Sequence, residues 1–232
     1  LEGFNLDREA CRAALKTLSE EFDFEFTLRH SDERLRIAVF VTKEAHCLYD
    51  LLNCQALGEL EGEIALIISN HETLRPVAEH FGLPFHIIRV TRETKAQAEA
   101  QQRALLKAEG VDVIVLARYM QILSPDFSRS WYGRCINIHH SFLPSFVGAN
   151  PYRQAKNRGV KIIGATAHYV TEDLDEGPII EQNVARVSHR DTVADLKRKG
   201  RDIERQVLSR AVRMHLENRI IITGNKTIVF DG

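Results

Sequence analysis

A segment near the middle of the chain carries an amide and an imidazole that could act on one carbonyl group. Asn137 and His139 stand two positions apart in it, and Asp175 follows in a later polar segment. Asn137 can donate a hydrogen bond, His139 can carry charge near neutral pH, and Asp175 can orient an imidazole or take a proton from water. Together they could stabilise the oxyanion that forms when a carbonyl is attacked. The set is suited to acyl transfer without a serine or cysteine nucleophile.

Each of these residues also has a plain structural explanation. An asparagine at a strand end commonly caps or turns the chain, and an aspartate just before Gly177 and Pro178 is a natural turn residue. A single buried histidine is usually a hydrogen-bonded structural residue. Three apolar residues that follow an earlier strand, Met120, Ile122 and Leu123, could belong to the core instead of a binding site. Spacing alone therefore leaves the function open.

The composition excludes several classes of protein. The chain has 232 residues, a formal net charge of −1 and 44% hydrophobic residues, which suits one large domain or one medium domain with a fragment attached. The mixed charges predict no nucleic-acid partner. No apolar run approaches the roughly 20 residues that a membrane helix needs, and the first residues do not resemble a signal peptide. The four cysteines show neither Cys-x-x-Cys nor zinc spacing, so we expect no metal site and a reduced, cytoplasmic protein.

Short apolar runs alternate with amphipathic segments from Leu35 onward. The expected strands lie at 37–41, 64–68, 85–88, 111–116 and 135–138, with helices between the first four at about 46–56, 72–81 and 94–109. Near-continuous apolar strands joined by helices predict a Rossmann-like α/β fold with an open, mostly parallel sheet covered on both faces. The remaining expected elements are a strand pair at about 161–170 and 178–186, a helix over 191–217 and a hairpin that turns at 224–225.

This fold would place the reactive residues at one edge of the sheet. Ligands of open parallel sheets bind beyond the carboxyl ends of the strands, where Asn137 and His139 end the fifth strand. Alternation puts these two side chains on the same side if the chain stays extended. Residues 116–125 leave the preceding strand at the same edge, and their apolar members could line a slot for a flat aromatic ligand. Only the fold can bring Asp175 to this place.

The N-terminal residues follow a different pattern. Residues 6–20 have apolar or small positions at helical spacing, and residues 22–28 alternate strictly between apolar and polar, which predicts a half-exposed strand. A helix and one strand make a poor independent core, so we expect residues 1–30 to be part of something larger. An exposed strand edge also favours association, which predicts a homo-oligomer.

Three runs, at 137–144, 164–170 and 174–180, resemble the folate-dependent formyltransferase-like family, and within it the formyltetrahydrofolate deformylases. The resemblance covers about 35–232. It implies a formyltransferase-like catalytic domain at 31–232 and, at 1–30, a partial regulatory domain of the α+β ACT type. It also implies that Asn137, His139 and Asp175 are catalytic. The substrate-binding residues that it implies are Arg118, Met120, Ile122, Leu123, His168, Val170 and Leu174.

One departure separates this sequence from a related branch. Glycinamide ribonucleotide formyltransferases carry a Gly-rich loop after the first strand, where backbone N–H groups can approach the acceptor's phosphate. Residues 42–48 contain no glycine here, and Glu44 would repel phosphate. The resemblance therefore predicts hydrolysis of 10-formyltetrahydrofolate by water to formate and tetrahydrofolate, which supplies formate for one-carbon and purine metabolism. The alternative is a formyltransferase that uses a small amine acceptor. In either case the folate is a substrate, and no cofactor is implied.

Overall fold

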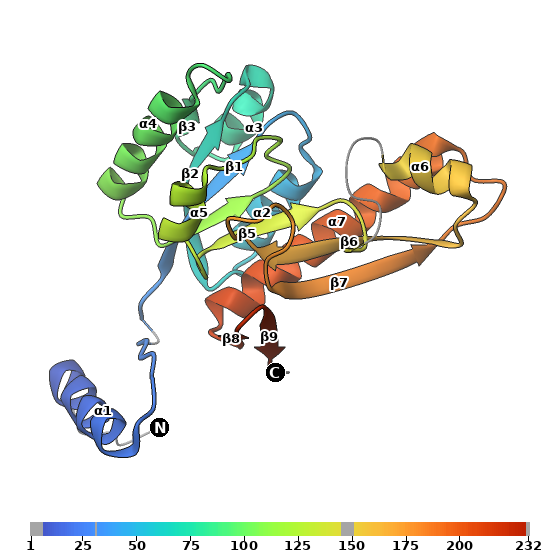
Figure 1. Ribbon diagram of the computed structural model, residues 1–232. Helices are drawn as coiled ribbons and strands as arrows, with labels where there is room; N and C mark the ends of the chain where they lie inside the picture. The colour runs from blue at the N-terminus through green and yellow to red at the C-terminus, as the bar shows by residue number, and fades with distance from the viewer. Residues whose placement is uncertain (1–6, 31, 145–150, 231–232) are drawn as a thin grey trace. The chain divides into compact units, whose positions relative to one another are not determined.

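The computed structural model describes residues 7–30, 32–144 and 151–230, apart from the side chain of residue 151. The chain divides into two compact units, Leu1–Arg34 and Leu35–Gly232. The larger unit holds a seven-stranded sheet in the order β3-β2-β1-β4-β5-β6-β7 (Figure 1). Its strands are β1 Leu35–Val41, β2 Gly62–Ser69, β3 Phe85–Ile87, β4 Val113–Leu116, β5 Cys135–His139, β6 Ile162–Tyr169 and β7 Ile179–Arg186.

The sheet is parallel from β1 to β5, whereas β6 runs antiparallel to β5 and β7 antiparallel to β6. The chain builds outward from β1 to β3 on one side and then returns to add β4 on the other. This reversal is the switch point beside which open α/β sheets bind their ligands. The Rossmann-like, mostly parallel sheet predicted from the sequence is confirmed.

Helices cover both faces of this sheet, because its strands are apolar on both sides. Ile37, Val39 and Val41 of β1 belong to one apolar cluster, whereas Ala38 and Phe40 belong to another on the opposite face. The first cluster is covered by helices α2 His46–Ala56, α3 Arg75–His80, α6 Pro151–Arg158 and α7 Val193–Leu216. The second is covered by α4 Lys95–Ala108 and α5 Pro125–Ser130.

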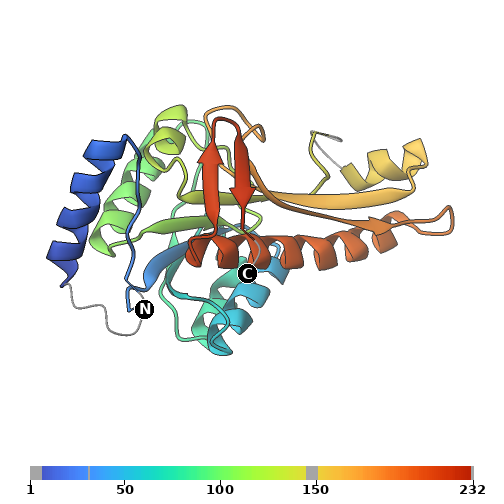
Figure 2. The same ribbon diagram turned by 90° about the horizontal axis from the view of Figure 1, so that it is seen from below.

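The longest helix, α7, packs along the antiparallel half of the sheet and against α2 and α6 (Figures 1 and 2). Thr192 and Asp195 begin it with a capping box, in which each side chain bonds to the other's backbone N–H. The hairpin of β8 Ile220–Thr223 and β9 Lys226–Val229 follows, with its turn at residues 224–225 as predicted. Among the residues that the structure describes, no helix combines the length and hydrophobicity needed to span a bilayer.

The expected elements of the larger unit agree with the structure within a few residues. One difference is the predicted helix at 72–81, which consists of a short 3-10 turn, Glu72–Leu74, followed by α3. The sequence reasoning also missed α5 and α6, which have six and eight residues. Such short helices contain only about two turns of 3.6 residues, which is too few to show a repeated apolar stripe in the sequence.

The smaller unit corrects one prediction. Helix α1, Arg8–Phe22, forms where the spacing predicts it, with Asp7 as its N-cap; Leu6, assigned to the same stripe, lies outside the described residues. The strand predicted over 22–28 is wrong, because Phe22 ends the helix, Asp23 is left-handed and residues 24–28 are irregular. A strand needs a partner for its backbone groups, and the described part of this unit offers only a helix. The strand edge that favoured a homo-oligomer is therefore absent, and the oligomer itself stays a prediction.

Candidate active site

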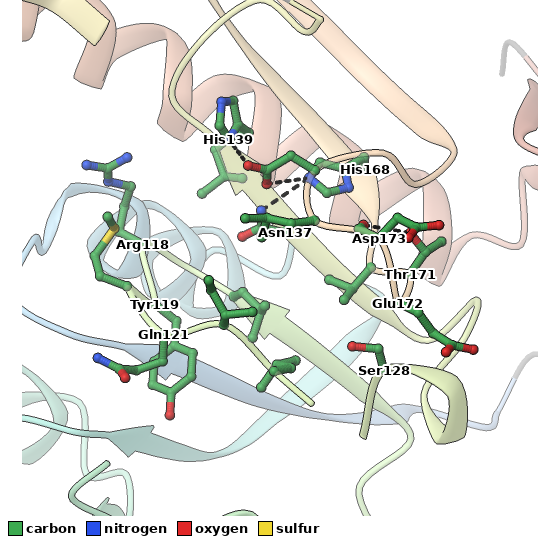
Figure 3. Close-up of a pocket in the computed structure, with 18 of the residues that line it drawn as sticks. Arg118, Tyr119, Gln121, Ser128, Asn137, His139, His168, Thr171, Glu172 and Asp173 are labelled. Atoms are coloured by element: carbon green, nitrogen blue, oxygen red, sulfur yellow. Dashed lines mark hydrogen bonds and ion pairs between the residues drawn. The ribbon is translucent and has the colours of Figure 1, made fainter. Parts of the chain in front are cut away.

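All ten residues predicted for the site line one cavity of about 280 Å³ at the carboxyl edge of β4 and β5 (Figure 3). Three segments that are distant in the sequence form its wall: the loop after β4, the end of β5, and the loop that joins β6 to β7. The cavity is polar at one end, where the predicted catalytic residues lie. It is mainly apolar along the two loops.

Strand register brings the polar residues together. The antiparallel pairing of β5 and β6 sets Asn137 opposite His168, and the parallel pairing of β4 and β5 sets Leu116 beside Asn137. Ile136 and Ile138 pack into the cluster beneath α7, so Asn137 and His139 face the other side, as alternation predicts. Nδ2 of Asn137 lies 3.2 Å from Nε2 of His168.

Asp175 reaches this group because the loop after β6 folds back tightly. Asp175 has a left-handed backbone with φ of 60°, and a Cβ on Gly177 would overlap the carbonyl oxygen of Tyr169. Oδ2 of Asp175 lies 3.1 Å from Nδ1 of His139, and its Oδ1 lies 3.7 Å from Nε2 of His168. One carboxylate therefore faces the imidazoles of His139 and His168, which Figure 3 labels.

The hydrogen bonds decide where the protons sit. A carbonyl oxygen only accepts, so Nδ1 of His168 donates to the backbone oxygen of Tyr169 at 2.9 Å. In the neutral imidazole, Nε2 of His168 then accepts from the amide of Asn137. In the same way, Nδ1 of His139 carries a proton toward Asp175. Burial raises the pKa of Asp175, but the hydrogen bonds and charges of His139 and His168 outweigh burial and hold that pKa well below its usual range.

One polar side-chain atom at this end of the cavity makes no hydrogen bond to the described residues. Nε2 of His139 is buried and has no hydrogen-bond partner among the described residues, although His139 lines the cavity. An unsatisfied buried nitrogen is costly in a folded protein and calls for a ligand or water. The neighbouring His140 is half-buried, and desolvation together with the charge of Arg118 lowers its pKa to about 4.

The loop after β4 exposes apolar side chains because its backbone is fixed on both sides. Oγ1 of Thr42 accepts from the backbone N–H of Met120 at 3.0 Å, and Glu99 of α4 accepts from both the backbone N–H and the hydroxyl of Ser124. The ring of Tyr119 packs edge-on against Phe40. Met120 and Ile122 are 56% and 61% exposed as a result. They are part of a cavity wall and not of the core.

The opposite loop contributes Leu174, which is 57% exposed, while Leu123 is nearly buried at 9%. The cavity also has lining residues that the sequence reasoning did not single out: Leu116, Tyr119, Gln121, Ser128, Ile138, Thr171, Glu172 and Asp173. Most of them lie in the two loops that the motifs already marked, so their place followed from the segment and not from their chemistry. Ser128, on the short helix α5, carried no signal in the sequence.

The fold and the site define an α/β protein whose mostly parallel sheet carries an amide, imidazole and carboxylate cluster at one end of an apolar slot. Residues 35–212 match the formyl transferase family. The chain is 53% identical over 229 residues to a formyltetrahydrofolate deformylase of Bacillus subtilis (strain 168), which covers 99% of this chain and 76% of the relative. It is also 53% identical over 230 residues to the formyltetrahydrofolate deformylase of Synechocystis sp. (strain ATCC 27184 / PCC 6803 / Kazusa), covering 99% of this chain and 81% of the relative.

Solved structures agree with this relationship. The formyltetrahydrofolate deformylase from Pseudomonas syringae pv. tomato str. DC3000 superposes with a TM-score of 0.95 and 48% identity over 98% of this chain and 76% of that one. A glycinamide ribonucleotide transformylase from Symbiobacterium toebii gives a TM-score of 0.81 and 31% identity over 89% of this chain and 99% of that one. The chain belongs to the formyl transferase family and, within it, to the formyltetrahydrofolate deformylases.

Proposed function

We infer that the protein is an enzyme that hydrolyses 10-formyltetrahydrofolate to formate and tetrahydrofolate. About 50% identity to curated formyltetrahydrofolate deformylases over most of the chain supports this activity. The observation that carries it in the structure is the cluster of Asn137, His139 and Asp175 at the polar end of the cavity. The activity needs no cofactor in this proposal, because the folate itself is the substrate.

The formyl oxygen is proposed to lie against Asn137 and the free Nε2 of His139. When water adds to the formyl carbon, the carbonyl oxygen becomes negatively charged, and donors already in place stabilise it without reorganisation. His139 can donate through Nε2 only when it is an imidazolium, since its Nδ1 proton faces Asp175. The carboxylate of Asp175 faces Nδ1 of His139, and the low pKa of Asp175 keeps this carboxylate charged at neutral pH.

The remaining steps balance with water alone. The attacking water gives up a proton to the Asp175 and histidine network or through it to solvent. The tetrahedral adduct then collapses, the carbon–nitrogen bond breaks, and the leaving nitrogen of the folate takes up a proton. Formate and tetrahydrofolate are released. No side-chain nucleophile takes part, which agrees with a polar end built from an amide, imidazoles and a carboxylate.

The flat pterin ring of the folate is proposed to occupy the apolar slot. Met120, Ile122 and Leu123 line one side of the slot, and Val170 and Leu174 belong to the opposite loop. The polar edge of the ring is proposed to bind donors and acceptors of these two loops, since small-molecule sites combine apolar walls with a few placed polar groups. Arg118 and His168 complete the proposed substrate-binding set.

A product assay tests the proposed activity directly. The protein is incubated with 10-formyltetrahydrofolate without any amine, and both formate and tetrahydrofolate are measured. Equal amounts of the two products are expected. A parallel reaction contains a small primary amine, such as glycinamide. Formation of an N-formyl amide with little formate would instead favour a formyltransferase.

Three further predictions accompany this function. Residues 1–34 form a unit of their own, and we propose, from the resemblance, that residues 1–30 are part of an ACT-type domain. We also propose that the enzyme assembles as a homo-oligomer and acts in the cytoplasm. Amino-acid titration of the full-length protein and its mass in solution would test the first two of these predictions.

A further inference from the structure

A second buried charge cluster lies behind the reactive histidine and is not used by the proposed mechanism. Its centre is Glu204 of α7, whose side chain is almost fully buried. The hydroxyl of Tyr152 donates to its Oε1 at 2.6 Å, and Nε2 of His46 donates to its Oε2 at 2.9 Å. Nε of Arg118 lies 3.4 Å from the same Oε2. Glu204 therefore joins α2, α6, α7 and the loop after β4.

Helix α7 has a glycine at the point where Tyr152 approaches Glu204. Gly200 stands one turn before Glu204 on α7, and a Cβ at this position would overlap the hydroxyl of Tyr152. Glycine inside a helix is destabilising relative to alanine. The cost is compensated here by the hydrogen bond that Tyr152 makes to Glu204. The glycine thus allows the side chain of Tyr152 to reach the buried carboxylate of Glu204.

The cluster also contains the atoms of a possible metal site, but its charge is already balanced. Ligand atoms of His46, Cys47 and Glu204 lie within 4.8 Å of one another. The Arg118 guanidinium occupies the place of a cation beside the carboxylate, and burial raises the pKa of Cys47 well above its usual value, which disfavours the thiolate. The guanidinium of Arg118, and not a metal ion, therefore serves as the counter-ion of Glu204 in this cluster.

Arg118 connects the cluster to the folate slot. It has a left-handed backbone with φ of 62°, a conformation that costs energy for any residue with a Cβ and persists only where neighbouring contacts impose it. Arg118 is followed at once by the slot-lining residues 119–123. The side chains of Arg118 and Tyr119 leave the loop in opposite directions (Figure 3), so the loop is held from both faces of the sheet. Oη of Tyr119 accepts from Gln102 of α4, and Arg118 pairs with Glu204 of α7.

We propose that Glu204 is a positioning residue for folate binding. By pairing with the Arg118 guanidinium it maintains the left-handed turn that starts the slot loop, and so fixes the positions of Met120 and Ile122 without touching the substrate. This inference deepens the function proposed above and rests on it. It predicts an effect on folate affinity and little effect on the chemical step, because the slot contacts the folate body equally before and during the reaction.

A double-mutant cycle tests the coupling. Glu204→Gln, Arg118→Gly and the double variant are compared with the wild type. Arg118→Gly is chosen because glycine adopts the left-handed turn without an anchor. For each protein, KM and kcat for 10-formyltetrahydrofolate are measured, together with the Kd for tetrahydrofolate by calorimetry. Val212→Ala serves as the control, since it removes buried atoms from α7 eight residues beyond Glu204 and lowers stability without touching the cluster.

Glu204→Gln should raise both KM and Kd about tenfold while kcat changes less than about threefold, as expected for groups in contact. In the Arg118→Gly background, the same change should alter either constant less than about twofold, because no guanidinium remains to be positioned. Val212→Ala should leave KM and Kd unchanged. If Glu204→Gln does not fold, Glu204→Asp keeps the charge but shortens its reach, and the same pattern is expected at smaller size.

The inference is overturned if Glu204→Gln leaves KM and Kd within twofold of the wild type. An equal effect in both backgrounds, or a similar rise in Val212→Ala, would also overturn it, since either result would reflect general loss of stability. The Kd for tetrahydrofolate separates this inference from the proposed function. A wild-type protein that releases no formate would refute hydrolysis, while the coupling between Glu204 and Arg118 could still be read from tetrahydrofolate binding.

Discussion

The two ends of the cavity are built in different ways. At the polar end, Asn137 and His168 are placed by the register of β5 and β6, and the carboxylate of Asp175 lies between two imidazoles, 3.1 Å from Nδ1 of His139 and 3.7 Å from Nε2 of His168. At the apolar end, Met120 and Ile122 stand exposed on a loop whose backbone is tied to its neighbours. Strand β5 therefore fixes Asn137 and His139, a tight loop adds Asp175 to them, and the loop after β4 carries apolar surface for the rest of the substrate.

This difference predicts separable effects on kinetics. Groups that stabilise charge only in the transition state should lower kcat when removed, whereas groups that contact the folate body throughout should raise KM. Substitutions at the two ends can therefore break or sharpen the comparison.

The largest effect is expected at His139. Loss of one oxyanion donor typically lowers kcat by about 10²–10³, so His139→Ala should do at least this with KM little changed. Asn137→Ala should lower kcat to a similar extent. Steady-state formate release measures the effect, and an unchanged circular dichroism spectrum with a similar melting temperature shows that the fold is intact. Near-wild-type turnover in either variant would reject the assigned role.

A somewhat smaller loss is expected for Asp175→Asn. The amide keeps the size of the carboxylate but cannot stabilise an imidazolium at His139, so kcat should fall by about 10²-fold or more while folate affinity changes little. The pH–rate profile of kcat should change shape as well, because a charged member of the proposed proton-transfer network has been removed. An identical profile at reduced rate would count against the proposed proton transfer.

Variants in the slot should show the opposite kinetics. Met120→Ala and Ile122→Ala each remove an exposed apolar side chain that the folate would bury, which is worth about 1 kcal/mol or roughly a fivefold rise in KM. We expect kcat to stay within about twofold, since neither side chain reaches the polar end. A large fall in kcat with constant KM would show that the slot and the polar end are not separable.

Much of this arrangement could be predicted from the sequence. Apolar runs and helical spacing gave the parallel sheet, and the distinctive segments around Asn137 and Asp175 gave the site by resemblance. The strand over 22–28 could not be judged in the same way. Alternation shows that a segment could be half buried, but a strand also requires a partner, and pairing depends on segments elsewhere in the chain.

The cluster around Glu204 shows a second limit. Nothing in a helical run of charged residues marks one glutamate as buried, because burial depends on which face of α7 meets α2 and α6. The left-handed turn at Arg118 also leaves no signal in the sequence. A glycine at this position would have indicated such a turn, but an arginine does not. Both features result from tertiary contacts, which local patterns do not contain.

The smallest effect is expected on the stability of the protein in acid. There, a charged residue of the polar end should behave differently from an uncharged residue of the apolar end. The pKa of Asp175 is lower in the folded protein than its ordinary unfolded value of about 3.9, so its ionised form contributes stability above that pH, and the contribution is lost as pH falls toward the folded pKa. The difference in unfolding free energy between the wild type and Asp175→Asn should therefore be constant above about pH 5 and shrink below about pH 4, by an amount on the order of 1 kcal/mol. Urea titrations across this range measure it. Met120→Ala alters no charge, so its unfolding free energy should differ from that of the wild type by the same amount at every pH. If the difference for Asp175→Asn is also constant, the two histidines do not hold this carboxylate in its charged form.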